Sequence, residues 1–196
     1  MSVVSRHGRR AGGRPVADPT LTAPFLLVAG PALQDPNFRR TVVLVISHDA
    51  EGTYGLVLNR GLEQTLADVL SEEDERAAGV PLLQGGPVQG EVLQLLGDGP
   101  GAEVFPGVSA LPVGEDLETL LAMLPDTTVA RAYLGYAGWG TDQLIGELEE
   151  GAWIVADPQR KHVFEIPPDR LWVSVLWELG GSYRWLALEG GDPTAN

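Results

Sequence analysis

Four polar side chains in two segments of the chain have the types and spacing that a ligand-binding or catalytic site would need. Asn59 and Arg60 follow a short apolar run, and Gln143 and Glu147 stand four residues apart. Gln143 lies in the first turn of a predicted helix, and Glu147 lies in a later turn of the same helix. These four residues are the convergent polar candidates that the sequence offers for an enzyme pocket.

Glycine-rich segments accompany these side chains. A candidate pocket would combine Asn59–Arg60, Gly85–Gly86 and the turn and helix from Gly138 to Glu147. Gly138 permits a tight or left-handed backbone, and burial of Trp139 would contribute about 2 kcal/mol. Free amides at the start of this helix could hold an anion, but Asp142 places a negative charge there. We therefore interpret this segment as a structural turn first and a ligand site second.

Several kinds of catalytic centre are missing from the sequence. The chain has no cysteine, which excludes disulfides, thiolate metal sites and a cysteine nucleophile. It has no G-x-S-x-G, phosphate-loop or H-E-x-x-H motif. His48, Asp49 and Glu51 carry metal-binding groups, but their spacing favours a polar turn, and His162 is predicted to lie at a strand edge. We predict no catalytic residue, no metal and no cofactor.

Charge is distributed unevenly along the chain. The net charge is −14, yet four arginines (Arg6, Arg9, Arg10 and Arg14) precede the first acidic residue, which leaves nine basic against 27 acidic residues in the remainder. Such a body repels nucleic acid phosphates, so direct DNA binding is disfavoured. The chain shows neither a membrane-spanning stretch nor a secretory signal, and we expect a cytoplasmic protein.

The apolar pattern predicts a single compact α/β domain over residues 24–190, with a disordered basic tail over 1–23 and a second tail over 191–196. Strand pairs without an intervening helix favour a mixed sheet flanked by helices. The predicted helices cover 62–70, 115–124, 141–150 (capped by Thr141) and 168–179. The predicted strands cover 24–29, 41–47 (a central strand), 54–59, 80–83, 91–96, 104–111, 129–136, a final pair at 152–155 and 163–166, and 182–188.

An ordered set of short motifs resembles the YqgE/AlgH family of bacterial proteins. The motifs extend from about Phe25 to Trp185, and each is weak alone while the order is specific. They are Phe25-Leu-Leu-Val-Ala-Gly-Pro31, Asp35 with Phe38-Arg-Arg-Thr-Val42, Gly55-Leu-Val-Leu-Asn-Arg60, Gly85-Gly-Pro-Val88, Leu134-Gly-Tyr-Ala-Gly-Trp139, Gln143-Leu144 with Glu147-Leu148, and Trp153.

The chain departs from the family pattern at two positions. Gly61 stands where the family usually has proline, and Asp142 stands where it usually has glycine. The resemblance implies a soluble, cytosolic protein with a mixed α/β fold. It also carries the label of a transcriptional regulator, for which the sequence offers no helix-turn-helix with a basic face.

Three functions follow as hypotheses. The leading one is a non-enzymatic binding or regulatory module that contacts an unidentified protein or small ligand. The second is an enzyme or small-ligand-binding protein of unknown class that uses the candidate pocket. The third, regulation of transcription by direct DNA binding, is disfavoured by the charge.

Overall fold

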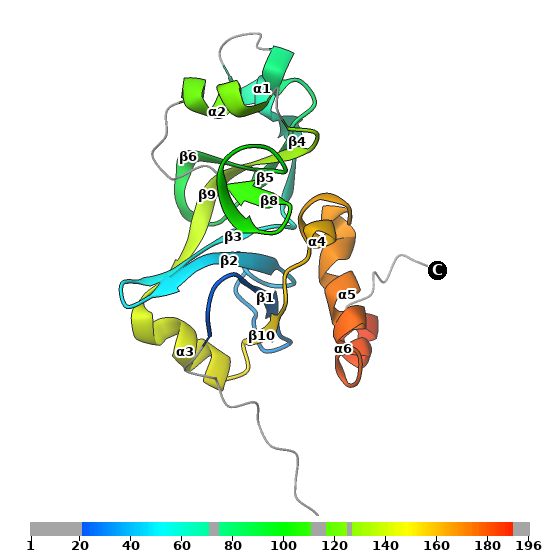
Figure 1. The fold of residues 1–196 in the computed structure, drawn as a ribbon. Coiled ribbons are helices and arrows are strands. Elements are labelled where there is room, and N and C mark those ends of the chain that lie inside the picture. The colour runs from blue at the N-terminus through cyan, green and yellow to red at the C-terminus, as the bar shows by residue number, and fades with distance from the viewer. Residues whose placement is uncertain (1–20, 71–74, 111–116, 125–126, 190–196) are drawn as a thin grey trace, which may run out of the picture.

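One long strand, β9 (Ala130–Trp139), connects the two halves of the structure. It pairs antiparallel with β6 (Val88–Gly97) and β3 (Gly52–Val57), and parallel with β5 (Pro81–Gln84). These strands meet near the middle of the molecule (Figure 1). The structure is a computed structural model that describes residues 21–70, 75–110, 117–124 and 127–189.

The first half of the sheet is antiparallel, in the order β10 (Trp153–Ala156), β1 (Phe25–Ala29), β2 (Val42–Asp49) and β3. All five residues of β1 and the first four of β2 are buried. Strands covered on both faces tolerate such continuous apolar runs. The predicted central strand over 41–47 is therefore confirmed, and it pairs antiparallel with the next strand, β3.

The second half of the sheet is built around β5 and β6. Strand β4 (Gly61–Thr65) pairs with β5, while β8 (Val108–Ala110) pairs with both β6 and β7 (Ala102–Phe105). The strand predicted over 104–111 is two short strands, β7 and β8, separated by Pro106 and Gly107.

Helices pack around both halves (Figure 1). A small cluster of buried residues, among them Leu66, Leu121 and Leu124, brings α1 (Leu66–Val69) and α2 (Leu117–Met123) onto one face of the second half. The main core contains β1, β2 and the inner faces of the other helices, which are α3 (Thr141–Glu149), α4 (Arg160–Phe164), α5 (Pro168–Leu179) and α6 (Tyr183–Glu189). The expected fold class, a mixed α/β domain with helices flanking a mixed sheet, is confirmed.

The predicted helix over 62–70 is wrong in its first half. Residues Gly61–Thr65 form β4, because this segment pairs with β5 at the edge of the sheet. Only Leu66–Val69 is helical. Leu62 is 39% exposed, so its apolar spacing with Leu66 does not reflect a shared buried face.

Two predicted strands are helices. The segment 163–166 was expected to pair with 152–155, but β10 pairs with β1 instead, and Val163 and Phe164 belong to α4. His162 consequently lies inside a helix, 1% exposed, rather than at a strand edge. The expected strand over 182–188 is α6, because the positive φ angles of Gly180 and Gly181 reverse the chain onto α5.

The start of α3 also differs from the prediction. Gly140 occupies the N-cap position and Thr141 is the first helical residue, so Thr141 is not the cap. The predicted tails over 1–23 and 191–196 lie outside the described residues, apart from Leu21 to Ala23. No helix in the described part of the chain has the length and apolar character needed to cross a membrane.

Candidate functional site

The loop between β1 and β2 is the place where the predicted site residues act together. Asn59, just after β3, accepts a hydrogen bond from the Val42 amide through Oδ1 at 2.9 Å and donates through Nδ2 to the Arg40 carbonyl at 2.9 Å. Arg60 donates through Nη2 to the Arg39 carbonyl at 2.6 Å. The Asn–Arg pair therefore fixes the backbone of Arg39 and Arg40 from outside the loop.

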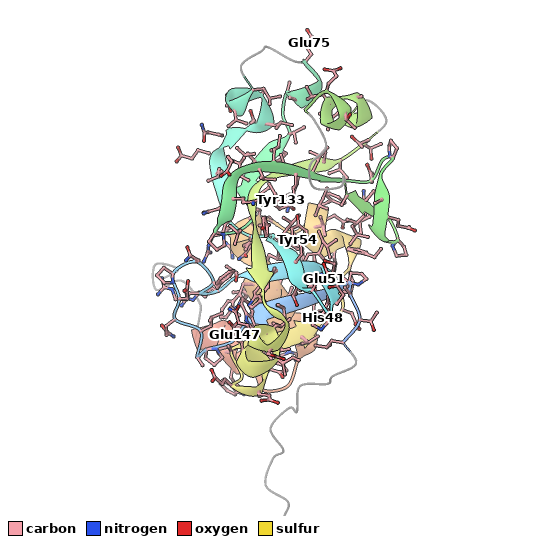
Figure 2. The ribbon with its side chains drawn as sticks, turned by 90° about the vertical axis from the view of Figure 1, so that its left-hand side faces the viewer. His48, Glu51, Tyr54, Glu75, Tyr133 and Glu147 are labelled. Atoms are coloured by element: carbon pink, nitrogen blue, oxygen red, sulfur yellow. The ribbon has the colours of Figure 1, made fainter. Side chains whose placement is uncertain are left out.

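A second brace holds the same loop from the other side. The ring of Phe38 packs against Trp139 and Trp153, with centroid distances of 5.7 Å to each. Glu147 accepts hydrogen bonds from both indoles through Oε2, at 2.9 Å from Trp139 Nε1 and 2.7 Å from Trp153 Nε1. Gln143 donates to its other oxygen, Oε1, at 2.9 Å. Figure 2 shows Glu147 on α3, near the end of β9.

Gly85 and Gly86 allow the connection between β5 and β6 to cross the backbone of β9. A Cβ atom on Gly85 would lie 2.4 Å from the Gly135 carbonyl oxygen, and one on Gly86 would lie 2.1 Å from the Tyr136 carbonyl carbon. Gly85 also accepts from the Val57 amide at 2.7 Å and donates to the Leu134 carbonyl at 2.7 Å. These glycines position β3, which in turn carries Asn59 and Arg60.

The loop is shaped so that its two arginines project from it. The Asp35 carbonyl accepts the amides of Phe38 and Arg39, at 3.0 and 2.7 Å, and forms a tight turn. Arg40 follows with φ of 57°, in the left-handed region that side chains other than glycine rarely adopt. Its guanidinium lies 5.7 Å from the centroid of the Trp172 ring. A residue held in such a conformation by several neighbours is a common feature of binding sites.

Arg39 and Arg40 line a hollow of about 230 Å³ between this loop and the C-terminal helices. Trp172 forms part of its wall and donates to the Ala29 carbonyl at 2.9 Å, so the indole is fixed in place. The lining residues are Gly30, Pro31, Leu33, Gln34, Arg39, Arg40, Trp172 and Leu186.

The electrostatic character of this hollow is opposite to that of the rest of the chain. Burial, and secondarily the positive charge of Arg39, lowers the pKa of Arg60, which places the two guanidinium groups in the same neighbourhood. Among the described carboxylates, none forms an ion pair with Arg39, Arg40 or Arg60. Three of the nine basic residues beyond the N-terminal arginines, Arg39, Arg40 and Arg60, therefore gather in one region without an ion pair to a described carboxylate.

Parts of the predicted three-segment pocket line two separate hollows among the described residues. Arg60 and Gly86 line a small hollow of about 60 Å³ beside the arginine loop. Gly138 and Trp139 line another, open hollow of about 560 Å³. Gln143 and Glu147 bond to each other and to the tryptophans, as described above.

The open hollow has acidic and aromatic walls. Asp49 ends β2 and Glu51 lies in the turn that follows, while the rings of Tyr54 and Tyr136 pack beside them with centroids 5.1 Å apart at an interplanar angle of 43°. His48 precedes this turn, with Nδ1 2.7 Å from the Thr53 hydroxyl. Figure 2 labels His48, Glu51 and Tyr54 on this side of the sheet. Within the described ranges, no group of three potential metal ligands comes together.

Sequence reasoning selected Asn59, Arg60 and Glu147, which stabilise the loop between β1 and β2, as candidate site residues. It did not select Arg39 and Arg40, whose side chains the loop exposes. Arg39 and Arg40 appeared only as part of a motif, because arginine is usually read as solvated surface. Arg39 and Arg40 are the only adjacent pair of arginines beyond the N-terminal segment, and this spacing was a usable signal.

The fold and the loop held by Asn59, Arg60 and Phe38 belong to a protein of the mixed α/β class. The AlgH-like family model matches residues 26–184, and the chain belongs to this family. A UPF0301 protein of Streptomyces coelicolor is 40% identical over 187 residues, covering 87% of this chain and 93% of its own. A UPF0301 protein of Chlorobaculum tepidum is 40% identical over 173 residues, covering 83% and 89%.

Solved structures agree with this assignment. The solution structure of the AlgH protein from Pseudomonas aeruginosa matches with a TM-score of 0.68 at 27% identity, covering 92% of this chain and 98% of that one. A crystal structure of a Corynebacterium diphtheriae protein matches with the same TM-score at 21% identity, covering 92% and 94%, and supports the fold alone.

Proposed function

We propose that this protein is a binding module whose ligand, a small molecule or a segment of a protein, carries an anionic group that docks on Arg39 and Arg40. The observation that carries the proposal is that two successive arginines line one hollow and form no ion pair with a carboxylate among the described residues. Such groups donate in a planar fork that matches a carboxylate or a phosphate.

The dimensions of the hollow favour a head group rather than a whole ligand. Pockets that enclose a drug-sized molecule occupy roughly 300–1,000 Å³, whereas this hollow measures about 230 Å³. An anionic group would fit inside, and the remainder of the ligand would lie over the rim near Leu186. The residues lining the hollow include no nucleophile and no carboxylate or histidine base, which supports binding rather than catalysis.

The braces explain why the loop is rigid before any ligand arrives. Asn59 and Arg60 hold its end, and Phe38 is packed against two tryptophans that Glu147 fixes. A preformed site loses less conformational entropy on binding than a site that has to be ordered.

The test is a calorimetric titration of the full chain with each of four probes: citrate, inorganic phosphate, pyrophosphate and a short acidic peptide. We expect binding of at least one probe, weakened about tenfold or more in the R39A/R40A variant. The control variant R170A/R184A removes the same charge from exposed positions elsewhere and should bind like the unmodified chain.

Arg40→Gly separates loss of the ligand contact from loss of stability, because glycine accepts the positive φ angle without strain. We expect this variant to unfold at nearly the same denaturant concentration yet to bind more weakly. Absence of binding to every probe, or equal weakening in the control variant, would overturn the proposal.

A further inference from the structure

Three hydrogen-bond donors inside the molecule find no partner in the described part of the chain. They are Gln94 Nε2, Arg131 Nη1 and the Tyr133 hydroxyl, on residues that are only 4%, 8% and 0% exposed. Gln94 and Tyr133 stand directly opposite each other on β6 and β9, and Arg131 lies two residues before Tyr133. Since side chains alternate along a strand, all three leave the same face of the sheet.

Neighbouring contacts fix where these donors point. The Tyr54 hydroxyl donates to Gln94 Oε1, which turns the amide nitrogen of Gln94 away from Tyr54. Arg131 donates through Nη2 to the Phe164 carbonyl at 3.2 Å and to the Ile166 carbonyl at 3.4 Å. Its Nη1 atom has no hydrogen-bond acceptor among the described residues. Figure 2 labels Tyr54 and Tyr133 in the middle of the molecule.

The phenol of Tyr133 remains a donor at all ordinary pH values. Burial raises the pKa of Tyr133, and Arg131 opposes this effect only partly, through its charge and through a hydrogen-bonding contact with the phenol oxygen. In that contact the phenol oxygen is the acceptor, so its O–H remains without an acceptor among the described residues. The influence of Arg131 on this phenol also places the two groups close together. The cluster thus consists of a neutral hydroxyl, a neutral amide and one positive charge, without a described carboxylate to balance that charge.

We propose that Gln94, Arg131 and Tyr133 form a buried binding site for a small inorganic anion of halide size. An unpaired buried charge and unsatisfied buried donors are strongly unfavourable, and one anion relieves all of them. A halide accepts from three donors and has no hydrogen of its own to place. A water molecule in the same position brings two hydrogens and leaves the charge of Arg131 uncompensated.

This site is separate from the arginine hollow. Its residues lie on β6 and β9 with their side chains buried, whereas Arg39 and Arg40 are exposed on the loop between β1 and β2. Occupancy would stabilise the junction of the two halves of the sheet, because β9 pairs with strands of both.

Thermal unfolding of the full chain tests this site, with sodium chloride and sodium bromide compared against sodium gluconate at equal ionic strength. A ligand that binds only the folded state raises the unfolding midpoint with its concentration, whereas general screening acts alike for all three salts. We expect a saturable rise of the unfolding midpoint in chloride and bromide alone.

Tyr133→Phe should weaken the apparent halide affinity about fivefold, since it removes one donor. Tyr136→Phe, a matched change in the same strand, should leave it unchanged.

A crystal grown in bromide supplies a direct readout that requires no variant. We expect an anomalous peak within hydrogen-bond distance of Gln94 Nε2, Arg131 Nη1 and the Tyr133 hydroxyl. Equal unfolding midpoints in halide and gluconate, or a water molecule without anomalous signal at this position, would overturn the proposal.

Discussion

The side-chain amide of Asn59 forms two hydrogen bonds with the backbone on either side of Thr41. Its nitrogen donates to the Arg40 carbonyl at 2.9 Å, and its oxygen accepts from the Val42 amide. One side chain therefore spans the point where the loop ends and β2 begins. The same point carries the left-handed conformation of Arg40. This relationship makes Asn59 a positioning residue for the arginine hollow, and it leads to the first prediction.

Asn59→Ala should lower the free energy of unfolding by about 2 kcal/mol, because it removes two hydrogen bonds and leaves the Val42 amide without its side-chain acceptor. Denaturation in urea measures the change. Gln34→Ala, which removes one exposed contact to the Pro31 carbonyl from the same loop, is the control and should cost less than about 0.5 kcal/mol. Equal effects of the two substitutions would contradict the positioning role of Asn59.

Glu147 provides the second prediction. Its Oε2 accepts from two indoles, so Glu147→Ala leaves both N–H groups without their acceptor and should cost about 3 kcal/mol. The tryptophan emission spectrum should shift to longer wavelength as Trp139 and Trp153 loosen. Glu149→Ala, at an exposed position on the same helix, should change neither quantity. An unchanged spectrum in the Glu147 variant would show that packing among Phe38, Trp139 and Trp153 is enough to keep the two indoles in place.

Sequence reasoning singled out Asn59, Arg60, Gln143 and Glu147 as candidate ligand-binding residues rather than as the braces of a loop. Gln143 and Glu147 were expected on one helix, and both lie on α3. Their partners could not be predicted, since the contact of Glu147 with Trp153 depends on how β10 returns beside β1.

The elements that were predicted wrongly share a physical cause. Residues 61–65 and 163–166 have apolar spacings that fit both a strand and a helix, and long-range pairing decides between them. Strand β4 exists because β5 offers it an edge. Because β10 pairs with β1, it does not pair with the segment 163–166, and Val163 and Phe164 lie in helix α4.

The dependence of stability on pH should trace to Asp98. Its carboxylate accepts hydrogen bonds from the Thr128 hydroxyl and from the amides of Val129 and Thr128, and it pairs with Arg160. These contacts, the Thr128 hydroxyl first, hold the pKa of Asp98 far below its ordinary value. The folded state therefore releases this proton more readily than the unfolded state does.

A depressed folded pKa contributes stability that is complete above the unfolded pKa of about 4 and is lost as the pH falls below it. We expect urea denaturation of the unmodified chain to show a loss of stability between about pH 4 and pH 2. Asp98→Asn should be less stable at pH 7 and should lose less over the same interval. Asp142→Asn, at an exposed position, serves as the control. Parallel pH profiles for the Asp98 variant and the unmodified chain would exclude this carboxylate as the source.

The crossing of Gly86 over β9 gives the last prediction. A methyl group at Gly86 would lie 2.1 Å from the Tyr136 carbonyl carbon, and its φ of 157° lies in a region that favours glycine. Gly86→Ala should therefore cost about 3 kcal/mol or more, since the colliding atoms belong to backbone and cannot rotate away. Gly90→Ala is the matched control, because a methyl group there meets nothing within 4 Å, and its effect should stay within about 1 kcal/mol. Chemical denaturation of the two variants decides the matter, and near-equal stabilities would mean that the β5–β6 connection can move away from β9.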